Sequence, residues 1–278
     1  MTKWIILIGS AWLLTTPIRA QPNCLLQKDA GCRRACELYA SENLYQGSRA
    51  SQMLYDSIIA LCPGFAPAYS EKSVPFLKNG DFAAWKKLED EAVRLDPVGH
   101  LGDRGWCRFK FLHDYEGALA DLNELERLQG SVLSGYSGDG TYQLRIIRAL
   151  CQRELGEVPN ALLELDASIL ASEKNDAVGL YDYLHRGATR LRAGDLEGAL
   201  NDFQKQVSKY PRSAESQYWL GLAYFPKGQL TEAKTCLETS KEQFNGAGYQ
   251  MNDPYCAFLD QVYRSDVEEL LSLLQAKK

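Results

Sequence analysis

The stretch 183–211, YLHRGATRLRAGDLEGALNDFQKQVSKYP, decides the fold. Its second half carries Ala199 and Phe203 four residues apart, which places both on one face of a helix. Gly194 and Asp195 interrupt the apolar pattern. Glycine accepts the left-handed end of one helix, and aspartate caps the start of the next. The stretch therefore predicts two amphipathic helices joined by a tight turn.

Similar segments recur along the chain. Each has a glycine or polar residue, then in most copies an acidic one, then an apolar one, followed three residues later in most copies by alanine. The spacing is 34 residues from Gly194 to Gly228 and 33 from Asp81 to Asp114. Wider gaps in the middle predict longer inserted turns, and 129–141 (QGSVLSGYSGDGT) reads as one such loop. The copies are 77–97, 113–125, 151–170, 183–211 and 219–238, with a degenerate first copy at 32–63.

On these segments the chain resembles the tetratricopeptide repeat (TPR) family, from about Cys32 to Asn245. The resemblance implies helix pairs stacked into a right-handed superhelix with a concave face. One pair cannot bury its apolar stripe alone, so neighbours must stack. We therefore expect an all-α solenoid of about six helix pairs over 21–245. A capping segment follows at 246–278, where Ser265 and Glu268 read as a capping box at the start of the last helix.

The closest approach between the helices of a pair requires a small residue. Counting back from the turn at Asp114 puts Trp106 in this position, where an indole would force the helices apart. We therefore expect one extra residue between Trp106 and His113, which moves Gly105 into the position and turns Trp106 toward the concave face. Three other copies have a small residue there: Gly187, Gly221 and Ala149.

The first 20 residues read as a secretory signal peptide. Lys3 precedes an apolar run of 11 residues, and Ala20 provides a small residue at the cut. A membrane-spanning helix needs about 20 apolar residues, so no membrane insertion is expected after cleavage. We expect an exported protein, periplasmic or secreted. The chain has no Asn-x-Ser/Thr sequon, which favours a bacterial envelope.

The chain has eight cysteines, an even number that in an exported protein suggests disulfides. The candidates are Cys24, Cys32, Cys36 and Cys62. Eight cysteines allow about 105 pairings, so the connectivity stays open. Four others fit either a disulfide or a small buried apolar residue: Cys107, Cys151, Cys236 and Cys256.

Composition and motifs argue against a catalytic site, a metal site and nucleic-acid binding. The net charge is −5 with no dominant basic stripe, so we expect no nucleic-acid partner. Cys32 and Cys36 lack a second cysteine or histidine pair at zinc-finger spacing. The carboxylates are spread along helix faces as solvated charges. We therefore expect no enzyme activity, no metal and no cofactor.

The resemblance implies that ligands lie along the concave face made by the first helix of each pair. Family members that clamp a peptide carboxylate use lysine and asparagine, and Leu184 and Ala188 do not supply them. The candidate partner-binding residues are Trp106, Phe109, Leu150, Arg153, Tyr181, Leu184, His185, Tyr218, Leu222 and Phe225.

Two functions fit this sequence. The first is a non-catalytic scaffold that binds a protein or peptide, since tyrosine and tryptophan dominate binding hot spots. The alternative is a carrier of a small ligand or glycan, which needs a closed aromatic pocket with a few converging polar groups.

Overall fold

A computed structural model describes residues 22–276, so the expected signal peptide lies outside the described residues. Every regular element in this range is helical, as expected. The chain divides into two compact units at Lys72 and Ser73, and each is described by itself. Within 22–276, no helix combines the length and apolar character needed to cross a membrane.

The described residues form thirteen α-helices and four short 3₁₀ or π turns, joined by irregular segments. The α-helices are α1 Ala30–Ala40, α2 Arg49–Leu61, α3 Ala66–Lys78, α4 Phe82–Leu95, α5 Pro97–Cys107, α6 Tyr115–Gln129, α7 Leu144–Glu154, α8 Val158–Glu173, α9 Asp182–Arg192, α10 Leu196–Lys209, α11 Ala214–Tyr224, α12 Leu230–Glu242 and α13 Arg264–Ala276. The short turns are η1 Cys24–Leu26, η2 Arg108–Leu112, η3 Phe225–Lys227 and η4 Gln243–Ala247.

The N-terminal unit is built on the packed pair α1 and α2. Asp29 caps α1 by accepting a 2.8 Å hydrogen bond from the Cys32 amide, and Ser48 caps α2. Tyr55 and Ile58 of α2 are buried in a small core. The unit therefore has little apolar area of its own and depends on covalent links.

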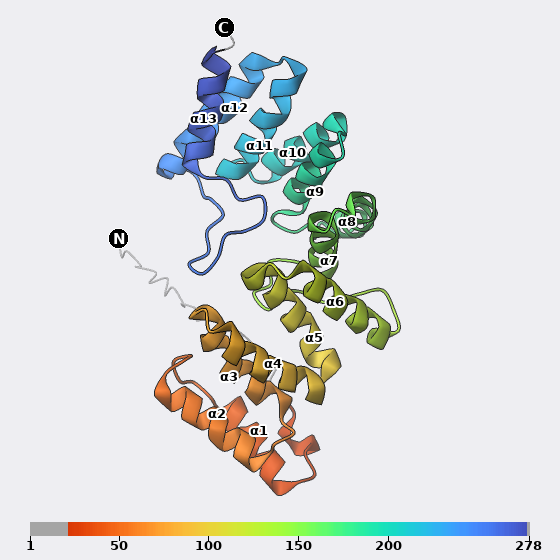
Figure 1. Cartoon of the computed structure of the whole chain (residues 1–278), viewed down its shortest axis with the longest axis vertical. Helices are drawn as coiled ribbons and strands as arrows, with labels where there is room; N and C mark the ends of the chain where they lie inside the picture. The colour runs from red at the N-terminus through yellow and green to blue at the C-terminus, as the bar shows by residue number, and fades with distance from the viewer. Residues whose placement is uncertain (1–21, 277–278) are drawn as a thin grey trace, which may run out of the picture. The chain divides into compact units, whose positions relative to one another are not determined.

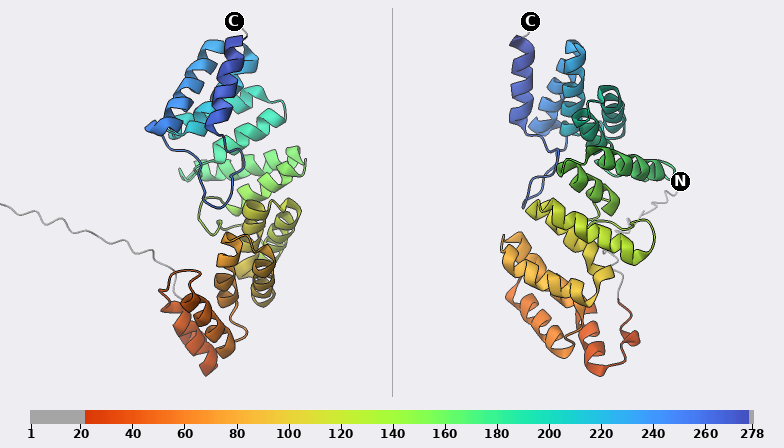
Figure 2. Two further views of the ribbon diagram at one scale, coloured as in Figure 1. Left: turned by 60° about the vertical axis from the view of Figure 1, so that its left-hand side comes forward. Right: turned by 45° about the vertical axis from the view of Figure 1, so that its right-hand side comes forward.

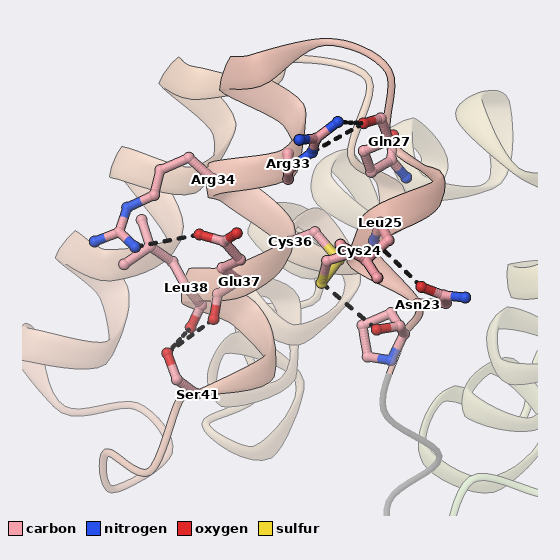
Figure 3. The surroundings of a disulfide bond; sticks show 11 residues. Asn23, Cys24, Leu25, Gln27, Arg33, Arg34, Cys36, Glu37, Leu38 and Ser41 are labelled. Atoms are coloured by element: carbon pink, nitrogen blue, oxygen red, sulfur yellow. Dashed lines mark hydrogen bonds and ion pairs between the residues drawn. A yellow bond between two sulfur atoms is a disulfide. The ribbon is translucent and has the colours of Figure 1, made fainter.

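Two disulfides supply those links. Cys24 pairs with Cys36, and Cys32 pairs with Cys62. Figure 3 shows the first of these, with Cys24 next to the turn that leads into α1. The expected disulfides in this group of cysteines are thus confirmed, with a connectivity that the sequence left open. The other four cysteines are free: Cys107, Cys151, Cys236 and Cys256.

The second unit is a stack of helix pairs, which confirms the predicted solenoid (Figures 1 and 2). The pairs α5–α6, α7–α8, α9–α10 and α11–α12 each pack closely, and each second helix also packs on the next first helix. The turns follow the predicted chemistry. Asp195 caps α10 through a 2.9 Å bond from the Gly198 amide, and Gly194 has a φ of 80°.

The small position inside each pair is confirmed. A Cβ added to Gly187 would lie 2.5 Å from the Phe203 ring, too close for any substituent. Gly105 takes the same position against Leu122, as expected. The extra residue is accommodated by the π turn η2, which widens the helix after Cys107 and ends at His113 in a left-handed conformation. A single inserted residue is the usual origin of such a turn.

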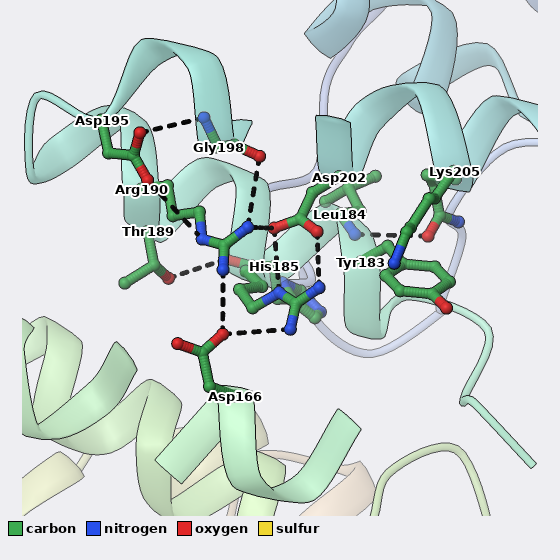
Figure 4. Close-up of polar contacts among 12 residues, drawn as sticks. Asp166, Tyr183, Leu184, His185, Thr189, Arg190, Asp195, Gly198, Asp202 and Lys205 are labelled. Carbon is green, nitrogen blue, oxygen red and sulfur yellow. Dashed lines mark hydrogen bonds and ion pairs between the residues drawn. The ribbon is translucent and has the colours of Figure 1, made fainter. Parts of the chain in front are cut away.

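Arginines at equivalent positions of successive first helices, which we call the arginine ladder, form ion pairs that link neighbouring helix pairs. Arg186, next to Gly187, lies 2.6 Å from Asp202 of its own pair and 3.0 Å from Asp166 of the preceding pair. Arg190 contacts the same two carboxylates (Figure 4). The equivalent arginines repeat the arrangement: Arg104 with Asp121 and Asp90, and Arg148 with Glu164 and Glu126.

The last helix, α13, packs on α12 at the end of the stack. The expected capping box at Ser265 and Glu268 is wrong. The helix begins earlier, and Asp266 accepts a 2.8 Å bond from the Tyr263 amide. Glu268 instead lies 3.0 Å from Arg264, one turn back on the same helix.

Candidate partner-binding face

The first helices of the pairs α5, α7, α9 and α11 carry most of the candidate residues, with Phe109 in η2, Tyr181 at the start of α9 and Phe225 in η3. The structure buries six of the ten candidates: Phe109, Leu150, Arg153, Tyr181, Leu184 and His185. The other four are half-buried: Trp106, Tyr218, Leu222 and Phe225. Binding of a partner at these ten residues therefore stays a prediction. Other parts of the chain already pack against several of them.

Tyr218, Leu222 and Phe225 lie in one apolar cluster with Val267 and Leu270 of α13. The capping helix therefore covers the α11 end of the predicted site. Burial and the nearby Asp266 and Glu269 raise the pKa of Tyr218. These three candidates belong to the terminal cap.

Arg153, Tyr181 and His185 are covered by 248–263, the irregular stretch between η4 and α13, which we call the crossing segment. It contacts η2, α7, α9 and α11 through hydrogen bonds and ion pairs. Figure 1 shows it as the dark blue loop that descends from α13 toward α9 and α7. We call the surface that it touches, formed by Lys110, Arg153, Tyr181, His185, Glu215 and Trp219, the first-helix face.

Asp260 is the centre of this contact. Its Oδ2 lies 2.7 Å from Arg153 Nη1 and 2.7 Å from His185 Nδ1. All three side chains are almost completely buried. Burial alone would raise the pKa of Asp260, but Arg153 and His185 hold it well below its ordinary value. Trp219 Nε1 donates to the Asp260 carbonyl oxygen at 3.0 Å, so the backbone is held as well.

A second anchor is Lys110, in the π turn η2. Its ammonium lies 2.9 Å from Asp253 of the crossing segment and 2.8 Å from Asp139 of the loop after α6. The rings of Trp106 and Phe258 lie 5.3 and 5.2 Å from the same nitrogen. Burial lowers the pKa of Lys110, but the two carboxylates outweigh it and hold the pKa above its ordinary value.

The loop at 130–143 is thus part of the site. It follows α6 where the sequence predicted an inserted loop. Asp139 also accepts a 2.7 Å bond from Ser137, and burial of Tyr142 closes the loop against the core. Tyr142 in turn lies 3.2 Å from His185 Nε2, so the loop supports the histidine that contacts Asp260.

The third anchor is at the start of the crossing segment. Tyr249 pairs with Arg212 and Ala214 through two backbone hydrogen bonds of 2.9 and 3.1 Å. The Met251 amide donates to Glu215 Oε1 at 2.6 Å. Glu215 is fully buried, and burial raises its pKa to about 7.

The sequence placed Arg153, His185 and Tyr181 on one face, and the structure does bring them together. The sequence analysis missed three residues of this face: Lys110, Glu215 and Trp219. Lys110 and Glu215 are charged residues that the structure buries. A lysine among the aromatics of 106–111 was the one available signal, because burying its charge requires carboxylates. Among residues 22–276, no cluster of three or more histidine, cysteine, aspartate or glutamate side chains could hold a metal ion.

Comparison with known proteins identifies the repeat. The family model for the tetratricopeptide repeat matches residues 215–244, which span α11 and α12. No curated protein sequence matches the chain. The match to the family model therefore covers the last helix pair.

Similar solved structures share the fold. PilW, a widely conserved type IV pilus biogenesis factor, is 15% identical with a TM-score of 0.58, over 77% of this chain and 92% of PilW. Yeast Tom70 is 14% identical with a TM-score of 0.55, over 87% of this chain but only 47% of Tom70. YrrB, a TPR protein with an unusual peptide-binding site, is 17% identical with a TM-score of 0.51, over 68% of this chain and 91% of YrrB.

Proposed function

We propose that this chain, whose fold is that of a tetratricopeptide-repeat solenoid, is a non-catalytic scaffold that binds a protein or peptide on the first-helix face. One observation carries the proposal. This face already binds an extended stretch of polypeptide, using side chains from three successive first helices and η2. It contacts both the backbone and the side chains of that stretch, as peptide-recognition surfaces do.

Two further observations support it. The TPR fold is shared with YrrB, which has a peptide-binding site of its own. The first-helix face also combines buried aromatic side chains with charged groups, the composition of interface hot spots.

We propose in addition that the protein works outside the cytoplasm. The two disulfides of the N-terminal unit support this, because such bonds persist in oxidising compartments and are rare in the cytosol. The expected signal peptide agrees with this location, which stays a proposal.

The alternative, a carrier of small ligands or glycans, draws no support from the described residues. It requires a closed pocket with stacked aromatic faces and a few converging polar groups. Tyr181 instead packs against Phe258 of the crossing segment at 6.0 Å, and Trp106 packs edge-on against Phe111 at 5.9 Å. These faces are already occupied by the chain's own side chains.

Photo-cross-linking in the cell of origin tests the proposed function. A benzoylphenylalanine replaces Trp106, which is half-buried beside Lys110 of the first-helix face. The matched control replaces Leu163, which is 72% exposed on the second helix α8. We expect a discrete cross-linked partner from position 106 and none from 163. Cross-links from 163 alone, or from neither position, would contradict the proposal.

A further inference from the structure

The crossing segment touches the first-helix face as a peptide ligand would. It has no regular secondary structure from 248 to 263 apart from an isolated bridge at Tyr249. Its hydrogen bonds within itself are few, such as Gln261 Nε2 to the Met251 carbonyl at 3.1 Å. No helix includes any of its residues.

Two of its side chains carry the recognition. The Phe258 ring lies 6.0 Å from Tyr181, and two residues later Asp260 bridges Arg153 and His185. The face thus contacts a three-residue pattern: an aromatic residue, any residue and then an acidic residue.

The acid is a requirement of the face. The Arg153 guanidinium carries a permanent charge, and its side chain is fully buried. Glu154 contacts it at 2.9 Å from the same helix, and Asp260 supplies the second carboxylate. A buried charge that loses its partner is strongly destabilising, so whatever replaces the segment must also present a carboxylate.

The fit of the segment is nevertheless incomplete. Arg153 Nη2 and Glu215 Oε2 are buried and have no hydrogen-bond partner among the described residues. Asp260 itself has a φ of 60°, a conformation that side chains other than glycine seldom adopt. A peptide that is not tied to α12 and α13 is free to meet these groups without that constraint.

We infer that the crossing segment is an internal ligand of the first-helix face, and that the partner is an extended peptide that replaces it by presenting an aromatic residue to Tyr181 and, two residues later, a carboxylate to Arg153 and His185. This rests on the proposed function and names the chemistry of its partner. Tethering gives the segment a high effective concentration, so it lowers the apparent affinity for any outside peptide.

Fluorescence anisotropy tests this with a labelled synthetic peptide of residues 248–263 in which serine replaces Cys256. The peptide is titrated with the full chain and with its Phe258→Ala variant, whose own segment holds the face less well. We expect at least about tenfold tighter binding to the variant, because the internal competitor is weakened. The Asp260→Asn peptide should bind at least about tenfold more weakly than its parent.

One further variant is a control, and another loosens the segment independently of Phe258. Tyr263→Ala alters an exposed side chain at the end of the segment and should bind the peptide as the unaltered chain does. Gln261→Ala removes bonds within the segment to the Phe258 amide and the Met251 carbonyl. It loosens the segment by a second route, and should also bind the peptide more tightly, even if Phe258→Ala fails to fold.

Equal affinity for the full chain and for the folded loosened variants would overturn the inference, as would equal binding of the Asp260→Asn peptide. A dimer of the loosened variants in light scattering would also overturn it, since the segment would then be exchanged between copies. Cross-linking from position 106 does not depend on these results, so failure of the inference and failure of the proposed function can be told apart.

Discussion

Two buried carboxyl groups hold the crossing segment, and their surroundings shift their pKa values in opposite directions. Asp260 lies against Arg153 and His185, which keep its pKa well below the ordinary value. Glu215 accepts a hydrogen bond from the Met251 amide, and burial raises its pKa to about 7. Asp260 therefore stabilises the fold over the whole neutral range, whereas ionised Glu215 destabilises it.

Replacing Glu215 by glutamine should change how stability depends on pH. Because the folded pKa of Glu215 is raised, its contribution is fully present below about pH 4 and is lost as pH rises through about 7. Glu215→Gln should thus stabilise the protein above pH 7, by at most about 3 kcal/mol, with little effect near pH 4. Thermal unfolding at the two pH values measures this, and an equal change at both would contradict the assignment.

At the scale of single residues, the sequence predicted the helix residues of the site but not the carboxylate of the crossing segment that pairs with them. The helical register placed Arg153 and His185 on the predicted face. Asp260 is 107 and 75 residues away from them in the chain. It lies in a stretch without periodicity, so no local pattern indicates that it pairs with them.

Helices and turns were the most predictable features. Glycine followed by aspartate marks the turn at Gly194, and the small residue at Gly187 marks the contact with Phe203. Even the extra residue between Trp106 and His113 followed from the size of Trp106, although the π turn that accommodates it was not predicted. The arginine ladder was missed, because an arginine on a helix usually reads as a solvated charge, and only the stack shows that it bridges two pairs.

The disulfides of the N-terminal unit give a prediction at the element scale. Replacing Cys32 and Cys62 together by serine opens a link between residues 30 apart. In the chain-entropy picture this should cost about 3–4 kcal/mol, in a unit with a small core. Chemical denaturation measures the loss, with the free Cys256→Ser as the matched control. Equal stability of the two variants, or a different pairing in a non-reduced peptide map, would contradict the connectivity.

At the scale of the whole second unit, the repeats predicted a binding face but not its occupant. Stacking follows from periodic apolar stripes, which the sequence displays. The course of the crossing segment is instead dictated by three anchors on other helices: Lys110, Glu215 and the Arg153–His185 pair. The sequence predicts a capping segment at 246–278; in the structure α13 packs on α12 and 248–263 crosses the first-helix face.

Amide hydrogen exchange of the crossing segment, with the chain unaltered, tests its displacement most directly. The Tyr249 and Met251 amides are bonded to Arg212 and Glu215, so they should exchange slowly in the free protein. We predict that a saturating amount of the synthetic 248–263 peptide makes both exchange faster, and that the Asp260→Asn peptide does not. Unchanged exchange at a concentration that saturates the anisotropy signal would show that peptides bind elsewhere, and that the segment is a fixed part of the fold.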